Sequence, residues 1–295
     1  MDQAQRLREL ASIERFRRFS AKSRSAKRIA VTSGKGGVGK SNFSLNFAVL
    51  AARLGKKVLL IDADTNLANI DILLGISPNF NISHVIAGLK SAEEILVAGP
   101  DGVSILPAAS GDIEQALNEG VASESVIADL NALEDKFDLV VMDTGAGASR
   151  TVLDFIIHAD TMVLITTPEP TAITDAYAVV KLISAERPDI DIQILINFAH
   201  DKREAQEVYE KLASVISHFL KLQTKFLGFM PRDNNLVEAV RRQKLLIQLF
   251  PQSPASNQMK FMTRKLLQLN RELPRKSAGI FSTLFRRFQN KESKT

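Results

Sequence analysis

The chain has 295 residues, of which 45% are hydrophobic and 24% charged, and its formal net charge is +5; this composition is ordinary for a globular protein. The absence of cysteine excludes a disulfide, a thiolate metal site and a cysteine-held iron–sulfur cluster. Because the sequence shows neither a signal peptide nor an apolar run of membrane-spanning length, we expect a cytoplasmic protein.

The positive charge is concentrated at the two ends of the chain. Residues 1–28 carry nine Arg or Lys against three Asp or Glu, and residues 275–295 carry six against one, so the body between them is acidic. Basic tails favour anionic partners such as acidic lipids, nucleic acid or an acidic protein face. We expect a basic N-terminal segment (1–27), one domain (28–274) and a separate C-terminal segment (275–295).

The N-terminal segment begins with a short helical pattern. Ala4, Leu7, Leu10 and Ala11 lie at helical spacing. A helix this short is marginal by itself, so we expect a flexible helix that becomes ordered on a partner. The alternative is a solvated tail.

A glycine-rich loop follows the apolar run at 28–33. Residues 34–41 read G-x-x-x-x-G-K-S, and a helix-like stretch comes next. This is the context of a phosphate-binding loop, in which backbone N–H groups and the helix N-terminus face phosphate oxygens. Lys40 would neutralise the β- and γ-phosphates, and the Ser41 hydroxyl would coordinate Mg²⁺. The expected ATP/ADP-binding residues are Gly34, Lys35, Gly36, Gly37, Val38, Gly39, Lys40, Ser41 and Asn42.

Strands and helices alternate from residue 28 onward. The apolar runs predict strands at 28–33, 57–63, 103–107, 137–143, 161–166, 191–197 and 225–230. Because most runs are apolar on both faces, they are typical of a parallel sheet covered by helices on each side. We therefore expect an α/β fold with a single doubly wound, mostly parallel sheet and a ligand at the carboxyl ends of its strands.

Polar residues stand at the ends of these strands. Asp62 and Asp64 follow the second strand, and Asp143 ends the strand at 137–143. Carboxylates beside a phosphate-binding loop hold Mg²⁺ and its waters or accept a proton from an attacking water. Turn capping explains the first pair equally well.

The C-terminal segment has the pattern of an amphipathic helix. Its apolar face consists of Ile280, Phe281, Leu284, Phe285 and Phe288, and arginines lie opposite. Aromatic residues opposite basic ones suit the headgroup boundary of an anionic membrane. The alternative is a terminal helix that docks its phenylalanines on the protein's own core.

The loop wording K-G-G-x-G-K-S resembles the deviant phosphate-binding loop of the MinD/ParA family of ATPases. The resemblance implies an ATP-dependent homodimer, in which Lys35 reaches the partner's nucleotide. It also implies that Asp64 positions the hydrolytic water and that Asp62 supports the magnesium ion. The implied catalytic set is Asp64, Lys35 and Lys40, the magnesium set Ser41, Asp62 and Asp143, and the adenine contacts Asn197, Pro231 and Asp233. An ordinary turn asparagine and a strand-ending proline explain the adenine positions equally well.

Within that family the chain is most similar to FlhG proteins. The motif D-Q-A-x-x-L-R falls on Asp2, Gln3, Ala4, Leu7 and Arg8, and D-T-G-A-G-x-S begins at Asp143. The resemblance implies control of flagellar number and placement, with the N-terminal motif stimulating the GTPase FlhF. It further implies flagellar C-ring or transcription-regulator partners, and peripheral association with anionic lipids on the inner face of the cell membrane.

Two alternatives remain open, a ParA-type ATPase that partitions DNA and a MinD-type ATPase that selects a division site. The acidic body and the Phe-rich tail argue against the first, so nucleic acid is not an expected partner. The N-terminal extension argues against the second.

Overall fold

The strands form one sheet in the computed structural model, which describes residues 26–64, 70–107, 124–268 and Phe281. The described strands are β1 (Lys27–Ser33), β2 (Val58–Ala63), β3 (Val97–Ala98), β4 (Ser104–Pro107), β5 (Leu139–Ala146), β6 (Thr161–Thr166), β7 (Asp191–Ala199) and β8 (Thr224–Pro231). Their order across the sheet is β3-β4-β2-β5-β1-β6-β7-β8. The pairings from β4 to β8 are parallel, and only the short β3 runs antiparallel to its neighbour. This confirms the expected α/β class and mostly parallel sheet.

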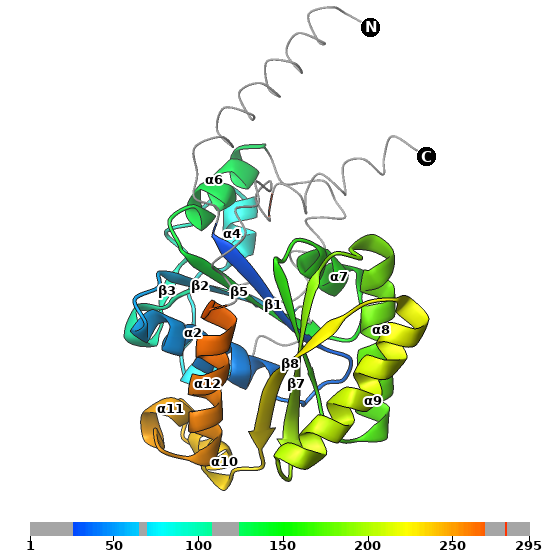
Figure 1. Ribbon diagram of the computed structural model, residues 1–295. Coiled ribbons are helices and arrows are strands. Elements are labelled where there is room, and N and C mark those ends of the chain that lie inside the picture. Colours follow the sequence, from blue (N-terminus) through cyan, green and yellow to red (C-terminus); the bar gives the residue numbers. More distant parts are fainter. Residues whose placement is uncertain (1–25, 65–69, 108–123, 269–280, 282–295) are drawn as a thin grey trace, which may run out of the picture.

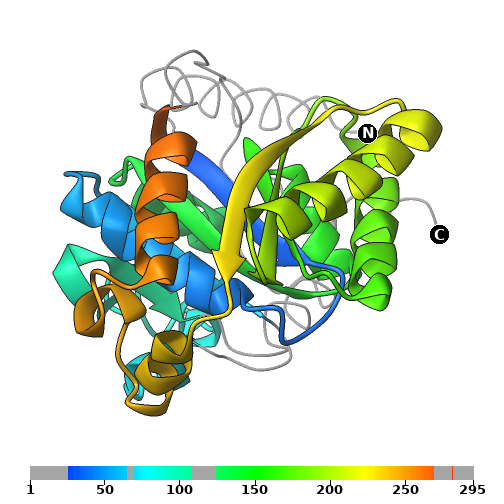
Figure 2. The same ribbon diagram turned by 60° about the horizontal axis from the view of Figure 1, so that its bottom comes forward.

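Helices cover both faces of the sheet, as Figures 1 and 2 show. The described helices are α2 (Lys40–Arg53), α3 (Ile70–Leu74), α4 (Ile82–Ile86), η1 (Pro100–Gly102), α6 (Glu124–Glu134), α7 (Arg150–Ile157), α8 (Pro170–Glu186), α9 (Lys202–Leu220), α10 (Asn234–Arg241), α11 (Leu246–Leu249) and α12 (Pro254–Gln268). One layer contains α6, α7, α8 and α9, and the other contains α2 and α12 (Figure 1).

Each face of the sheet has its own apolar core because side chains alternate along a strand. In β1, Ala30 belongs to the core beneath α7 and α8, whereas Ile29 and Val31 belong to the core beneath α2 and α12. The strand β2 divides in the same way, with Leu59 on one side and Leu60 on the other. Burial on both faces explains the near-continuous apolar runs in the sequence.

The differences from the expected strands are small and lie at strand ends. β5 continues three residues beyond Asp143, to Ala146, because Thr144 pairs with Ala63 of β2 and Ala146 pairs with Ser33 of β1. β7 likewise continues past Asn197 to Ala199. The two-residue β3 gives too short a pattern to be recognised from sequence.

Candidate nucleotide-binding site

The glycine-rich loop joins the end of β1 to the start of α2, in the centre of the sheet. Gly37 and Gly39 have φ angles of 76° and 93°, which residues with a side chain rarely adopt. Gly34 is needed for a different reason, since a Cβ there would lie 2.2 Å from the backbone carbonyl carbon of Asp175 in α8. The loop is therefore curled and packed closely against α8.

The N-terminus of α2 is suited to an anion. Its N-cap residue is Gly39, and no side chain caps the helix. The first amide groups of such a helix carry the positive end of the helix dipole and bind phosphate readily. The Ser33 hydroxyl donates to the Lys35 carbonyl at 2.7 Å and helps to shape the loop entrance.

Lys40 is the first residue of α2 and is only 7% exposed. Burial lowers its pKa, and the nearby carboxylates of Asp143 and Asp64 oppose that change. A buried ammonium group is costly unless an anion compensates it. A bound phosphate chain would add to the compensation that Asp143 and Asp64 provide.

Asp143 lies inside β5 and is fully buried. Burial raises its pKa from 3.8 to about 6, against the effect of the Ser41 and Ser44 hydroxyls and the Lys40 ammonium. Its Oδ1 accepts a hydrogen bond of 2.8 Å from Ser44, while Oδ2 has no hydrogen-bond partner within the described parts of the chain. An unpartnered buried oxygen beside Ser41 fits a magnesium ion held directly or through water.

Asp62 lies beside Asp143 in the parallel register of β2 and β5. Its Oδ2 accepts a hydrogen bond from the Ile70 amide at 3.2 Å, and its Oδ1 a long one from the Asp64 amide at 3.5 Å. Asp62 thus joins the two sides of residues 65–69, which lie outside the described residues. Asp64 stands at the same edge, since a Cβ on Gly145 would lie 3.3 Å from its Oδ1.

The structure therefore brings together Lys40, Ser41 and the three predicted aspartates. Among the described residues no group of three or more His, Asp or Glu is arranged to hold a metal by itself.

Lys35 is on the solvent side of the loop. Its Nζ lies 2.7 Å from a Glu169 carboxylate oxygen, and the two side chains are 44% and 63% exposed. The hydrogen bond to Glu169 raises the pKa of Lys35, which stays charged. An exposed pair of this kind is weak, so Lys35 can exchange Glu169 for a phosphate.

The expected adenine contacts lie at the ends of β7 and β8. The Asn197 amide donates to the Val38 carbonyl of the loop at 2.7 Å. Asp233 caps α10 by accepting from the Asn235 amide at 2.9 Å and also accepts from the Ala255 amide at 3.2 Å. Pro231 ends β8 opposite Ala199. The hydrogen bond to Val38 places Asn197 beside the loop. Contact of all three residues with adenine stays a prediction.

The structure places one residue of the predicted membrane face in the core. Phe281 is 2% exposed and belongs to the apolar core beneath α7, α8 and α9. For Phe281 this agrees with the alternative that the sequence left open, in which a terminal phenylalanine docks on the protein's own core. The predicted partner-binding residues 2–8 and the remaining tail residues, Ile280, Leu284, Phe285 and Phe288, lie outside the described residues.

Sequence reasoning missed two residues of this site. Ser44 donates to Asp143, and its position four residues after Lys40, between the apolar Phe43 and Leu45, was an available signal. Glu169 pairs with Lys35 across 134 residues, and no local pattern indicates that contact.

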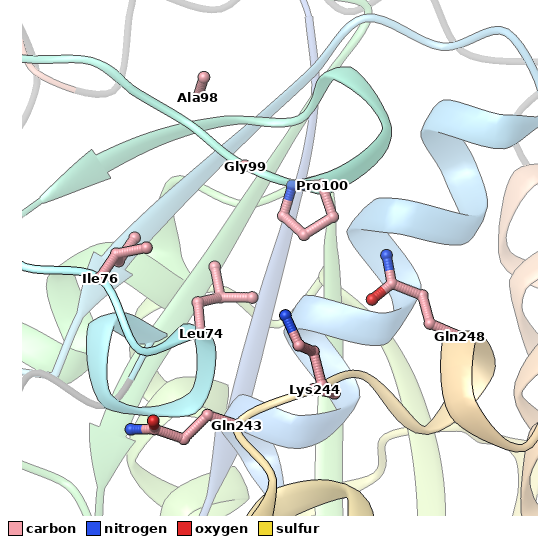
Figure 3. Close-up of a pocket in the computed structure, with 8 residues that line it drawn as sticks. All are labelled: Leu74, Ile76, Ala98, Gly99, Pro100, Gln243, Lys244 and Gln248. Carbon is pink, nitrogen blue, oxygen red and sulfur yellow. The ribbon is translucent and has the colours of Figure 1, made fainter.

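A separate cavity of ≈ 310 Å³ lies between α3, η1 and the turn after α10 (Figure 3). Its lining residues are Leu74, Ile76, Ala98, Gly99, Pro100, Gln243, Lys244 and Gln248. Gln243 joins its two sides by donating to the Ile72 carbonyl at 3.0 Å. None of the lining residues belongs to the loop or to the three aspartates.

Comparison with known proteins identifies relatives over most of the chain. Residues 29–247 match the CobQ/CobB/MinD/ParA nucleotide-binding domain. The chain is 38% identical over 238 residues to the antiactivator FleN of Pseudomonas aeruginosa, covering 81% of this chain and 85% of that protein. It is 34% identical to the flagellum site-determining protein YlxH of Helicobacter pylori, covering 85% of each.

Solved structures agree with these relatives. The MinC:MinD cell division complex of Aquifex aeolicus contains a chain that is 28% identical, with a TM-score of 0.66, covering 85% of this chain and 99% of that one. MinD of Pyrococcus horikoshii, solved with Mg-ADP, has a TM-score of 0.67 at 22% identity, which shows the shared fold; it covers 83% of this chain and 97% of that one. In the described part of the chain, no helix is long and apolar enough to span a membrane. The phosphate-binding loop, the three aspartates around it and these matches together show that the chain belongs to the MinD/ParA family and is an ATPase of the FlhG type.

Proposed function

We propose that this ATPase is an ATP-dependent dimeric switch that controls the number or placement of flagella. The observation that carries the proposal is its likeness, over more than four-fifths of the chain, to an antiactivator and to a flagellum site-determining protein. The test is to replace the chromosomal gene with the Lys40→Ala variant and count flagella per cell by electron microscopy. A changed count or position is expected, and unchanged flagellation would contradict the proposal.

The nucleotide is held by the residues around the loop. The amide groups from Gly36 to Lys40 and the Lys40 ammonium hold the phosphates, and the burial of Lys40 leaves its charge little screened by water. Ser41 and Asp143 hold Mg²⁺, which neutralises charge on the phosphates when bound. Asp62 would support the ion by holding Asp64 at this edge of the sheet through its contact with the Asp64 amide.

Asp64 orients the attacking water and accepts its proton. This role agrees with its half-buried position beside Gly145 and its attraction to Lys40. Lys35 completes the site of a second subunit, because its exposed side chain releases Glu169 and pairs with a phosphate across the dimer. Hydrolysis removes that phosphate and with it the contact that joins the subunits.

The N-terminal segment acts on a partner, the GTPase FlhF, through Asp2, Gln3, Ala4, Leu7 and Arg8. The experiment measures GTP hydrolysis by purified FlhF with a peptide of residues 1–28 and with the same peptide carrying Gln3→Ala. We expect stimulation by the first peptide and not by the second. Equal rates with and without peptide would remove FlhF from the proposal and leave the ATPase switch intact.

The C-terminal segment binds anionic lipid in the dimer. Two short helices held in one dimer bind far more tightly than one, so dimerisation switches membrane residence. Since Phe281 is buried in the core, membrane binding requires that it leave this position. Deleting 275–295 should abolish ATP-dependent pelleting with liposomes that contain acidic lipid, and unchanged pelleting would assign the segment to the core alone.

A further inference from the structure

We propose that Asn197 is a positioning residue that holds the phosphate-binding loop in its anion-binding shape. In this role it raises affinity for the phosphate chain whichever base the nucleotide carries. The inference builds on nucleotide binding by the loop and gives Asn197 a different task from the base contact expected from sequence.

Both polar atoms of the Asn197 side chain form hydrogen bonds within the protein. It is 4% exposed. Its Nδ2 donates to the Val38 carbonyl at 2.7 Å, and its Oδ1 accepts from the Phe198 amide at 2.8 Å. The amide group therefore links the end of β7 to the middle of the loop, across 159 residues of sequence.

The backbone next to Asn197 adopts an unfavourable conformation where this link is made. Phe198 has a φ of 58°, in the left-handed region that residues with side chains avoid. The register between β7 and β8 shifts between Ile196 and Ala199. Such strain persists where the surrounding structure holds it and is concentrated at functional sites. The Arg232 guanidinium supports the turn by donating to the Phe198 carbonyl at 3.3 Å.

The loop has a glycine, Gly39, at the point where it faces the Asn197 side chain. A Cβ on Gly39 would lie 2.5 Å from the Asn197 Nδ2, so a side chain at position 39 and the Asn197 amide exclude each other. Gly39 directly precedes Lys40 and is the N-cap of α2. Asn197 thus packs against the turn that presents both Lys40 and the amide groups, and its loss would loosen every phosphate contact together.

The test measures binding of Mg-ATP, Mg-GTP and Mg-tripolyphosphate to the full chain by titration calorimetry. Asn197→Ala removes the amide, and Asn197→Asp keeps the shape but sets a carboxylate oxygen against the Val38 carbonyl. The matched control is Asn257→Asp, because Asn257 also donates its amide to a backbone carbonyl, that of Gln252, on an exposed part of α12. Each titration is run at a temperature below the thermal unfolding midpoint of the variant. If Asn197→Ala does not fold, the result for Asn197→Asp tests the inference.

We expect both Asn197 variants to bind ATP and tripolyphosphate about tenfold more weakly, as for one buried hydrogen bond lost. The ATP-to-GTP ratio should stay as in the unmodified chain, and the control should bind all three as that chain does. A loss confined to ATP would make Asn197 a base-reading residue, and unchanged affinity would remove it from the site; either result overturns the inference. The affinity of the unmodified chain for ATP tests separately whether the loop binds nucleotide at all. A failure of nucleotide binding is thus distinguished from a failure of the role proposed for Asn197.

Discussion

Asp143 is expected to lower the stability of the nucleotide-free protein, and Asp143→Asn to raise it. The carboxyl is fully buried and its pKa is raised from 3.8 to about 6. Because one pKa unit corresponds to 1.36 kcal/mol, holding the charged form in the fold costs about 3 kcal/mol above pH 6. The raised folded-state pKa means that this cost is absent below pH 3.8, develops between pH 3.8 and 6, and is complete above pH 6.

Urea unfolding of the unmodified chain and of Asp143→Asn, both without nucleotide, measures this cost. At pH 8 the variant should unfold with a free energy about 2–3 kcal/mol higher, and at pH 5 the gain should be roughly half as large. The same variant should lose Mg²⁺-dependent ATP hydrolysis, because Asp143 is a proposed ligand of the ion. A variant that is less stable at pH 8, or a difference that does not change with pH, would refute the reasoning.

Three further predictions concern other parts of the site. Lys40→Ala should abolish ATP binding in a fluorescent-nucleotide titration while the exposed control Lys244→Ala binds normally; tight binding by Lys40→Ala would contradict its role. Glu169→Gln should release Lys35, so that light scattering detects the ATP-bound dimer at lower protein concentration, and weaker dimerisation would instead show that Glu169 supports the interface. Phe281→Ala should lower the unfolding midpoint and, without nucleotide, raise liposome pelleting; pelleting that falls below that of the unmodified chain would show that Phe281 itself contacts lipid.

Local sequence patterns were sufficient to predict the central strands of the sheet. The runs around Ile61, Val141 and Leu164 are apolar on both faces, which a parallel sheet between two helical layers requires, and they gave the correct strands. The loop from Gly34 to Ser41 carries its own chemistry in consecutive residues, so its place before α2 was also predictable.

Contacts between distant residues were not predictable in the same way. The pairs Lys35–Glu169 and Asn197–Val38 join residues 134 and 159 positions apart, and their geometry depends on where β6, α8 and β7 come to lie. Phe281 shows another limit, because an aromatic face on a terminal helix has the same pattern whether it meets lipid or the protein's own core. Burial of Phe281 in the core is a tertiary result that its neighbours in sequence do not encode.

The central claim is that ATP joins two subunits through Lys35 and that Asp64 is needed to end that state. Light scattering on the Asp64→Ala variant with ATP and Mg²⁺ tests it most directly, with the double variant Lys35→Ala, Asp64→Ala as the matched control. We expect a lasting dimer for Asp64→Ala and an ATP-bound monomer for the double variant. A monomeric Asp64→Ala protein with ATP bound, or a dimer that persists without Lys35, would contradict it.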